Sequence, residues 1–330
     1  MRGEKPAHPT LFEFAIGNAV TQTLTSHIAY DPNDPNLHYK RLIDAFRIAG
    51  YDYALIRGRS FAFKTNRHKE TGKASISLNE GFMIYDRESF DNYHWMEPED
   101  ADYTWLDDLA AYLPEGMKLV VPGPDGVFET VLALIGHDNM CYMLADDPEL
   151  VKDVFDGVGS RYLKYYETCA KYDVVGAMMA DDDWGFNTQT FLSVNDMKKY
   201  ILPWHKKIAE VAHRANKPII LHSCGNIEAV MDDVIYDIRY DARHSFEDNI
   251  IPVETAYEKY YGKIALLGGI DVDFLTRSTP EMIYERSCAM LKRTKDRGGY
   301  ALGSGNSIPD YVPAKNYFAM IAACLMNNGI

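Results

Sequence analysis

The chain has 330 residues, of which 47% are hydrophobic and 25% are charged, a balance that excludes disorder as its main state. Its 34 lysines and arginines face 48 aspartates and glutamates, giving a formal net charge of −14. Without a compensating basic run, this charge opposes binding to nucleic acid. No apolar run is long enough to span a bilayer, and the first residues lack the apolar core of a secretory signal. We therefore expect a cytoplasmic protein that does not bind membranes.

Short apolar runs alternate with amphipathic stretches along most of the chain. The runs that predict strands are, in chain order, 53–56, 117–121, 174–179, 218–221, 238–242, 264–267 and 300–302. The stretches that predict helices are 127–135, 148–172, 193–216, 227–236, 252–261, 280–295 and 313–327. Pro203 falls inside the third of these helices and is expected to kink or split it.

The alternation of strand and helix predicts a parallel sheet covered by helices. An open doubly wound sheet and a closed (β/α)8 TIM barrel both fit this order. The absence of a G-x-G-x-x-G run after a strand favours the barrel. We predict an N-terminal extension, an insertion over the barrel mouth within 57–115, and room for an eighth strand within 60–95. Because no linker or repeat divides the chain, a single domain over 1–330 is expected.

Polar side chains follow successive predicted strands. In a TIM barrel such residues meet at the C-terminal face, where the chemistry of this fold takes place. Each one alone is a common feature of barrels, so their concurrence is the informative observation. The residues in question are Arg57, Arg59, Asp181, Asp182, Asp183, Trp184, His222, Cys224, His244, Glu247, Asp271, Ser304 and Asn306.

His222 and Cys224 form an H-x-C pair on the loop after one predicted strand. Imidazole and thiolate are both good zinc ligands, and two residues apart they can face one ion. The alternative is a core histidine beside a half-buried thiol. A catalytic zinc ion needs about three protein ligands, and Glu247 is the best third donor. Substitutes for it are Asp181, Asp182 and Asp271.

The remaining residues at the strand ends suggest substrate binding. Arg57 and Arg59 could bind a substrate carboxylate in forked geometry, or could lie on an exposed loop. The aspartates 181–183 could hold a cation or act as acid and base, and Asp182 and Glu247 are the candidate catalytic carboxylates. Trp184 could stack on a ring or belong to the core.

Further candidates for substrate binding come from other strand ends. The loop with Ser304 and Asn306 could cradle an anion with its backbone N–H groups. Asp181 and Asp271 complete the predicted set of residues around the substrate.

The stretch from Asp181 to Phe318 resembles the uroporphyrinogen decarboxylase superfamily. The matching pieces are DDDWGFNTQTFLS, KKYILPWHKKI, LHSCGN, ALLGGIDVDFLTRSTPEMI and GGYALGSGNSIPDYVPAKNYFAM. This resemblance implies a barrel and two alternative chemistries. The decarboxylases act without metal on an acidic tetrapyrrole and carry an R-Q-A-G-R signature, which is absent here. The corrinoid-linked methyltransferases use zinc held by H-x-C and a later cysteine.

The H-x-C pair favours the methyltransferase branch, with one departure. Where the coenzyme M methyltransferases carry their second cysteine, in the last glycine loop, this chain has Ser304. A zinc site with one sulfur and more oxygen donors should be a stronger Lewis acid, which suits polarising the oxygen of a methyl ether. The expected reaction is therefore demethylation of a methylated or methoxylated small substrate.

The resemblance thus implies one zinc ion per chain, with partial occupancy an option. No D-x-H-x-x-G run is present, so cobalamin would arrive only on a partner corrinoid protein. The alternatives are a cofactor-free decarboxylase of an acidic, tetrapyrrole-like substrate and a barrel that binds ligand without chemistry. The oligomeric state stays open, with a homodimer as one option.

Overall fold

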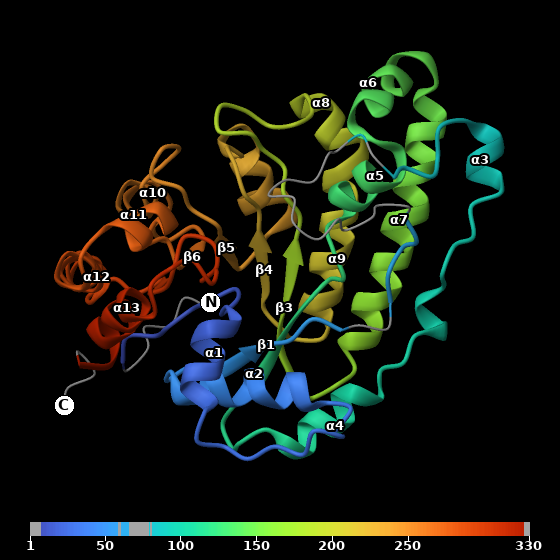
Figure 1. Cartoon of the computed structure of the whole chain (residues 1–330). Helices are drawn as coiled ribbons and strands as arrows, with labels where there is room; N and C mark the ends of the chain where they lie inside the picture. The colour runs from blue at the N-terminus through green and yellow to red at the C-terminus, as the bar shows by residue number, and fades with distance from the viewer. Residues whose placement is uncertain (1–7, 59–60, 66–78, 80, 327–330) are drawn as a thin grey trace.

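The computed structural model describes residues 8–58, 61–65, 79 and 81–326. Its centre is a sheet of parallel strands that pair in sequence order (Figure 1). The strands are β1 Tyr53–Leu55, β2 Lys118–Pro122, β3 Val175–Asp181, β4 Ile219–His222, β5 Ala242–His244, β6 Ala265–Leu267 and β7 Tyr300–Ala301. These strands are mostly buried apolar runs, as expected for parallel strands covered by helices.

The register of the central strands places three polar residues in one row. Asp181 at the end of β3 pairs with His222 at the end of β4, and His222 pairs with His244 at the end of β5. Because the strands are parallel, all three side chains lie at the same edge of the sheet. This edge corresponds to the C-terminal face at which the sequence predicts the site.

Helices follow the strands and cover the sheet (Figure 1). They are α1 Asn18–Thr25, α2 Leu37–Ile48, α3 Arg87–Asp91, α4 Thr104–Tyr112, α5 Val127–Ile135, α6 His137–Asp146, α7 Pro148–Cys169, α8 Val194–Asp196, α9 Leu202–Arg214, α10 Val253–Tyr260, α11 Val272–Arg277, α12 Pro280–Thr294 and α13 Ala314–Met326. On one side of the sheet α7 packs against α5 and α9, and elsewhere α12 packs against α13.

The predicted helices agree with the structure except at two places. The helix predicted over 193–216 is divided into α8, a π-helical turn at Met197–Ile201 and α9, so that Pro203 falls in the first turn of α9. Proline is tolerated there because the first-turn N–H groups have no helical partner. Over 227–236 the chain forms a 3₁₀ turn and then a π-helical turn at Asp233–Ile238, which delays the following strand to Ala242.

The insertion predicted over the barrel mouth within 57–115 stays a prediction, because most of 59–80 lies outside the described residues. The rest of 57–115 contains α4, which packs against α2 at the end of the sheet opposite the strand tips (Figure 1). Here α4 is the ordinary helix between β1 and β2. The eighth strand expected within 60–95 is not found among the described residues of that range. A complete (β/α)8 barrel is therefore not what the described part of the chain forms.

An extended N-terminal segment lies beside the last strand instead. The N–H of Phe12 donates to the carbonyl of Leu302 over 2.8 Å, and the N–H of Leu302 donates to the carbonyl of Thr10 over 2.8 Å. Glu13 is tied to β1, because its backbone exchanges two hydrogen bonds with the Tyr53 hydroxyl. We call residues 10–17 the N-terminal segment. This segment contacts both β7 and β1.

Candidate metal centre

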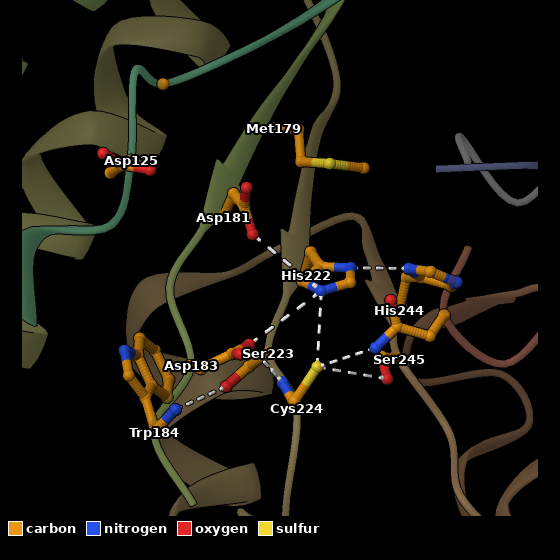
Figure 2. A network of polar contacts seen from close by, with 12 residues as sticks. Asp125, Met179, Asp181, Asp183, Trp184, His222, Ser223, Cys224, His244 and Ser245 are labelled. Carbon is orange, nitrogen blue, oxygen red and sulfur yellow. Dashed lines mark hydrogen bonds and ion pairs between the residues drawn. The ribbon is translucent and has the colours of Figure 1, made fainter. Parts of the chain in front are cut away.

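Three side chains with metal-binding atoms converge at the tips of β3 and β4. Asp183, His222 and Cys224 place one oxygen, one nitrogen and one sulfur all within 4.8 Å of one another (Figure 2). The His222 Nε2 atom lies 3.5 Å from the Cys224 Sγ atom and 3.9 Å from an Asp183 carboxylate oxygen. The structure thus brings His222 and Cys224 together as predicted, with Asp183 beside them.

Backbone geometry places these three residues. Gly225, which follows Cys224, has a φ of 81°, and a Cβ atom there would lie 2.0 Å from the carbonyl oxygen of Gly185. Only glycine allows this turn. The Cys224 N–H donates to Asp183 over 2.7 Å, which fixes the carboxylate next to the thiol.

The surroundings of Cys224 and Asp183 disfavour the ionised forms of these two side chains. Burial, followed by the charge of Asp183, raises the pKa of the Cys224 thiol well above its usual range. Burial also raises the pKa of Asp183. A divalent cation between them would favour the ionised form of both groups. Nitrogen, sulfur and oxygen donors from three residues match a zinc site with an open fourth position.

Two further side chains contact the Cys224 sulfur. The Asn306 amide, in the loop after β7, donates to Sγ over 3.0 Å. The Ser245 hydroxyl, after β5, lies 3.7 Å from Sγ (Figure 2). The last loop therefore reaches the site through Asn306, which the sequence assigned only to substrate binding.

Ser304 lies elsewhere, although the resemblance placed it where a second zinc ligand would stand. It is fully buried, and both its hydroxyl, over 2.6 Å, and its N–H, over 3.2 Å, donate to Glu13. Burial raises the pKa of Glu13 to about 8, so this carboxyl group is mainly neutral at pH 7. Ser304 does not reach the metal-binding cluster and has no opening toward a substrate.

His244 contacts His222 on the side away from the cluster. The two Nδ1 atoms are 2.7 Å apart, and the His244 Nε2 atom lies 3.2 Å from the carbonyl oxygen of Ser304. Burial holds the pKa of His244 well below its usual range, so the ring is neutral. The sequence placed His244 at the mouth but gave it no role.

The N-terminal segment packs two aromatic rings onto this histidine pair. Phe14 stacks on His222 with ring centroids 4.2 Å apart, and Phe12 meets His244 edge-on at 5.1 Å. Sequence reasoning missed Phe12, Glu13 and Phe14. An apolar–acid–apolar run is typical of many buried segments, so it carries no specific signal for a site.

The three consecutive aspartates point in different directions. Asp182 is fully buried and accepts hydrogen bonds from the N–H groups of Phe128 and Glu129, each over 3.0 Å, at the start of α5. The His205 Nε2 atom lies 2.9 Å from the same carboxylate. This arrangement does not fit the predicted catalytic role of Asp182, because its oxygens are engaged and closed to solvent. Asp182 is a cap for α5.

Trp184 and Asp271 also have structural surroundings. Trp184 is fully buried and packs edge-on against His205 with centroids 4.7 Å apart, so it belongs to the core and not to a stacking surface. Asp271 accepts from the N–H groups of Asp248 and Phe274 and caps α11. It nevertheless lines a cavity that opens beside the site.

That cavity has a volume of about 760 Å³ and lies over the loops after β5, β6 and β7. Glu247, Asp271 and Asn306 contribute to its wall, as do the aromatic rings of Phe274 and Tyr311. Because Asn306 also touches the Cys224 sulfur, the cavity adjoins the metal-binding cluster. Of the residues predicted to bind substrate, Asp271 and Asn306 therefore share one cavity, whereas Arg57, Asp181, Trp184 and Ser304 do not line it.

Glu247 does not join the cluster as the predicted third ligand. One of its oxygens accepts a hydrogen bond from the Gly225 N–H over 3.2 Å, which leaves it beside the loop of Cys224. Among the described residues Asp183 supplies the carboxylate that stands with His222 and Cys224. Asp181 is nearby, with an oxygen 3.8 Å from the His222 Nε2 atom (Figure 2).

Arg57 is bound within the protein. Its guanidinium donates to the carbonyls of Gly123 and Pro124, over 2.7 and 2.5 Å, and pairs with Asp181. It therefore joins the loops after β1, β2 and β3, and its donors are not turned to a substrate. The prediction for Arg59 falls outside the described residues.

Glu129 is an acidic residue near the site that the sequence did not indicate. Burial and the charges of Asp183 and its two neighbouring aspartates raise the pKa of Glu129 to about 10. The carboxyl group is consequently neutral at pH 7. Nothing in its sequence context, the first turn of an apolar helix, distinguishes Glu129 from an ordinary residue near a helix N-terminus.

Across the described part of the chain, no helix combines the length and apolar character that crossing a bilayer requires. The chain is similar in fold to a methyltransferase from Methanosarcina mazei, with a TM-score of 0.72 and 14% identity over 98% of this chain and 96% of that one. Two other solved structures are less similar in fold, with TM-scores of 0.48 and 0.43. They are the structures of a protein described as a vitamin-B12 independent methionine synthase from Listeria monocytogenes (10% identity, 100% and 97% covered) and a glycosylated endo-β-1,4-xylanase from Gloeophyllum trabeum (14%, 69% and 82%).

A search of curated protein sequences gave no match. The sequence profile of the uroporphyrinogen decarboxylase family, by contrast, matches residues 124–325, which is more than half of the chain. This span includes β3 to β7 and all three residues of the metal-binding cluster. The chain belongs to the uroporphyrinogen decarboxylase (URO-D) family.

Proposed function

We propose that the chain is a zinc-dependent methyltransferase that moves a methyl group from a small methylated or methoxylated compound to a corrinoid carried by a partner protein. The observation that carries this proposal is the convergence of Asp183, His222 and Cys224 at the strand tips. The likeness to the Methanosarcina mazei methyltransferase supports the same reaction class. Membership of the URO-D family alone would support decarboxylation and methyl transfer equally.

In this proposal Asp183, His222 and Cys224 hold the zinc ion. Bound there, zinc would act as a Lewis acid on the substrate oxygen. The donor set has one sulfur, and the oxygen donor makes the site less electron-rich than one with two thiolates. This composition favours breaking a methyl ether over activating a thiol.

The reaction breaks the bond between the methyl carbon and the ether oxygen, and the electron pair of that bond stays on the oxygen. The pair for the new bond to the methyl group would come from the reduced corrinoid on the partner protein, and the departing alkoxide or phenolate would take a proton from water. The chain's own residues position the substrate and exclude water. The wall of the cavity beside Asn306, with Phe274 and Tyr311, has the apolar surface that a small ring would contact.

The charges around the site favour an uncharged substrate. Arg57 is neutralised by Asp181, Asp183 belongs to the metal-binding cluster, and the Glu247 and Asp271 carboxylates line the open cavity. An anionic group would therefore be repelled. The same observation counts against the decarboxylase alternative, because an acidic tetrapyrrole needs free cationic side chains, and Arg57 is not free.

Metal binding and methyl transfer test the proposal together. Zinc is added at about pH 8 to the wild type and to His222→Ala, and bound metal is counted by calorimetry. One zinc ion per chain is expected in the wild type and none in the variant. The loaded wild type should then convert free cob(I)alamin to methylcobalamin with a methoxylated phenol, as followed by absorbance.

The control is Glu115→Gln, an exposed position far from the cluster in sequence, which should behave as the wild type. Failure of the wild type to bind zinc would overturn the proposal. Carbon dioxide release from an acidic substrate in the presence of chelator would establish the decarboxylase in its place.

A further inference from the structure

A chain of polar contacts runs from the last loop of the sheet to the proposed zinc ligand His222. The Ser304 carbonyl oxygen lies 3.2 Å from the His244 Nε2 atom, and the His244 Nδ1 atom lies 2.7 Å from the His222 Nδ1 atom. The opposite nitrogen of His222, Nε2, faces Cys224 and Asp183 (Figure 2). His222 therefore stands between His244 and the cluster.

The nature of the first acceptor determines where each proton lies. A carbonyl oxygen can only accept, so His244 must carry its proton on Nε2. In the neutral His244 ring the Nδ1 atom is then an acceptor, and the proton between the two rings belongs to the His222 Nδ1 atom. A neutral His222 with its proton on Nδ1 has its lone pair on Nε2, the atom that a metal ion needs.

We propose that His244 is a positioning residue that holds His222 in the tautomer whose Nε2 lone pair faces Cys224 and Asp183. This inference rests on the proposed zinc site and deepens it. Metal-binding histidines generally use their second ring nitrogen to donate to an acceptor, which fixes the ring and its tautomer. A second histidine serves as that acceptor here, and its own orientation is fixed by a backbone carbonyl.

The N-terminal segment holds this chain of contacts in place. Glu13 accepts from both the N–H and the hydroxyl of Ser304, which holds in place the residue whose carbonyl orients His244. Phe12 and Phe14 pack on the two imidazole rings and limit their rotation. His244 is fully buried and both of its nitrogens are engaged, so it has no atom left to bind the metal itself.

Two substitutions of His244 separate hydrogen bonding from packing. His244→Asn places a carbonyl oxygen near the position of Nδ1 and keeps an acceptor for His222. His244→Leu removes the acceptor and keeps similar volume. Zinc affinity is measured by calorimetry at about pH 8, and the tautomer of His222 is measured in the metal-free protein by ¹⁵N NMR of labelled histidine.

The wild type and His244→Asn should both show the His222 proton on Nδ1 and bind zinc within about threefold of each other. In His244→Leu the proton should move in part to Nε2, and zinc affinity should fall about 10- to 100-fold. Equal zinc affinities in the wild type and His244→Leu would overturn the proposal, and so would equal losses in both variants. Either result would mean that the ring acts only by packing.

The NMR measurement also separates this proposal from the zinc function. A wild type that binds no zinc but carries the His222 proton on Nδ1 would refute the zinc site and leave the hydrogen-bond chain intact. A wild type that binds zinc but carries the proton on Nε2 when metal-free would refute the role of His244 alone. The tautomer of His222 in the metal-free wild type therefore tests the role of His244 even if His244→Leu does not fold.

Discussion

The amide of Asn306 donates a hydrogen bond to the sulfur of Cys224 over 3.0 Å. The last loop of the sheet thus offers a neutral amide to the thiol, where two-cysteine sites of the kind that the sequence resembles would offer a second thiolate. Ser304, which the resemblance places at the position of that thiolate, is turned toward Glu13. Residue 306, and not residue 304, is therefore the position in the last loop that determines which group contacts the Cys224 sulfur.

Asn306→Cys is expected to raise zinc affinity by about tenfold or more, equivalent to about 1.4 kcal/mol, because a second thiolate would stand next to Cys224. The matched control is Ser304→Cys, which adds a thiol to the same loop but points it away from the cluster. Calorimetric titration with zinc compares the three proteins. A gain in Ser304→Cys without one in Asn306→Cys would contradict this placement.

Asp183→Asn is expected to lower zinc affinity by about tenfold or more, because it replaces the proposed charged oxygen ligand with a weak neutral one. The amide oxygen can still accept from the Cys224 N–H, so the loop should keep its conformation. Glu247→Gln, at the carboxylate outside the cluster, should change the affinity by less than about threefold. The reverse order would restore Glu247 as the third ligand.

Glu13→Gln should remove a pH dependence of stability. The pKa of Glu13 is raised from 4.5 to about 8, so between these values the folded protein keeps a proton that the unfolded chain has lost. The free energy of unfolding must therefore decline as pH rises through this range, by at most about 1.4 kcal/mol per pH unit from this group. Above about pH 8 the contribution is constant.

Urea unfolding of the wild type and Glu13→Gln between about pH 5 and 9 measures this decline. The amide does not titrate, so the difference in stability between the two proteins should grow in favour of the variant as pH rises. Glu115→Gln at an exposed position serves as the control. A constant difference across the range would mean that Glu13 is already ionised in the folded protein.

Asp182→Ala is expected to destabilise the fold by about 3 kcal/mol, because two buried N–H groups at the start of α5 would lose their acceptor. Gly126→Ala should also destabilise it, since the added Cβ atom would lie 2.0 Å from an Asp182 oxygen. Thermal unfolding measures both effects. Zinc stoichiometry should stay at the wild-type value, and its loss in Asp182→Ala would return this residue to the site.

The sequence allows the pair His222 and Cys224 to be predicted because both residues belong to one strand end, where local pattern is sufficient. It also locates the three aspartates at the neighbouring strand end. Side chains on a strand alternate between its faces, so Asp181 and Asp183 share one side and Asp182 takes the other. This period could have identified Asp183 as the third donor and Asp182 as the buried one.

Contacts between distant segments are harder to predict. Glu13 and Phe14 reach the site only because the N-terminal segment lies beside β7, a pairing that no local pattern records. An eighth strand from 60–95 would instead have come between β1 and β2, which pair directly with each other. The substrate-binding roles predicted for Trp184 and Ser304 do not fit the structure because both side chains are buried. Both residues follow strands, but their side chains face the core.

The contact between Glu13 and Ser304 joins residues that are 291 positions apart. During synthesis on a ribosome, the residues that form β4 and the H-x-C pair emerge well before Ser304 does. The residue whose carbonyl orients His244 is therefore missing until Ser304 has been made. A nascent chain that ends before Ser304 can present His222 and Cys224 to a metal ion, but it cannot yet fix the His222 ring through His244. Selective uptake of the proposed zinc ion is therefore expected only after the last loop has been synthesised.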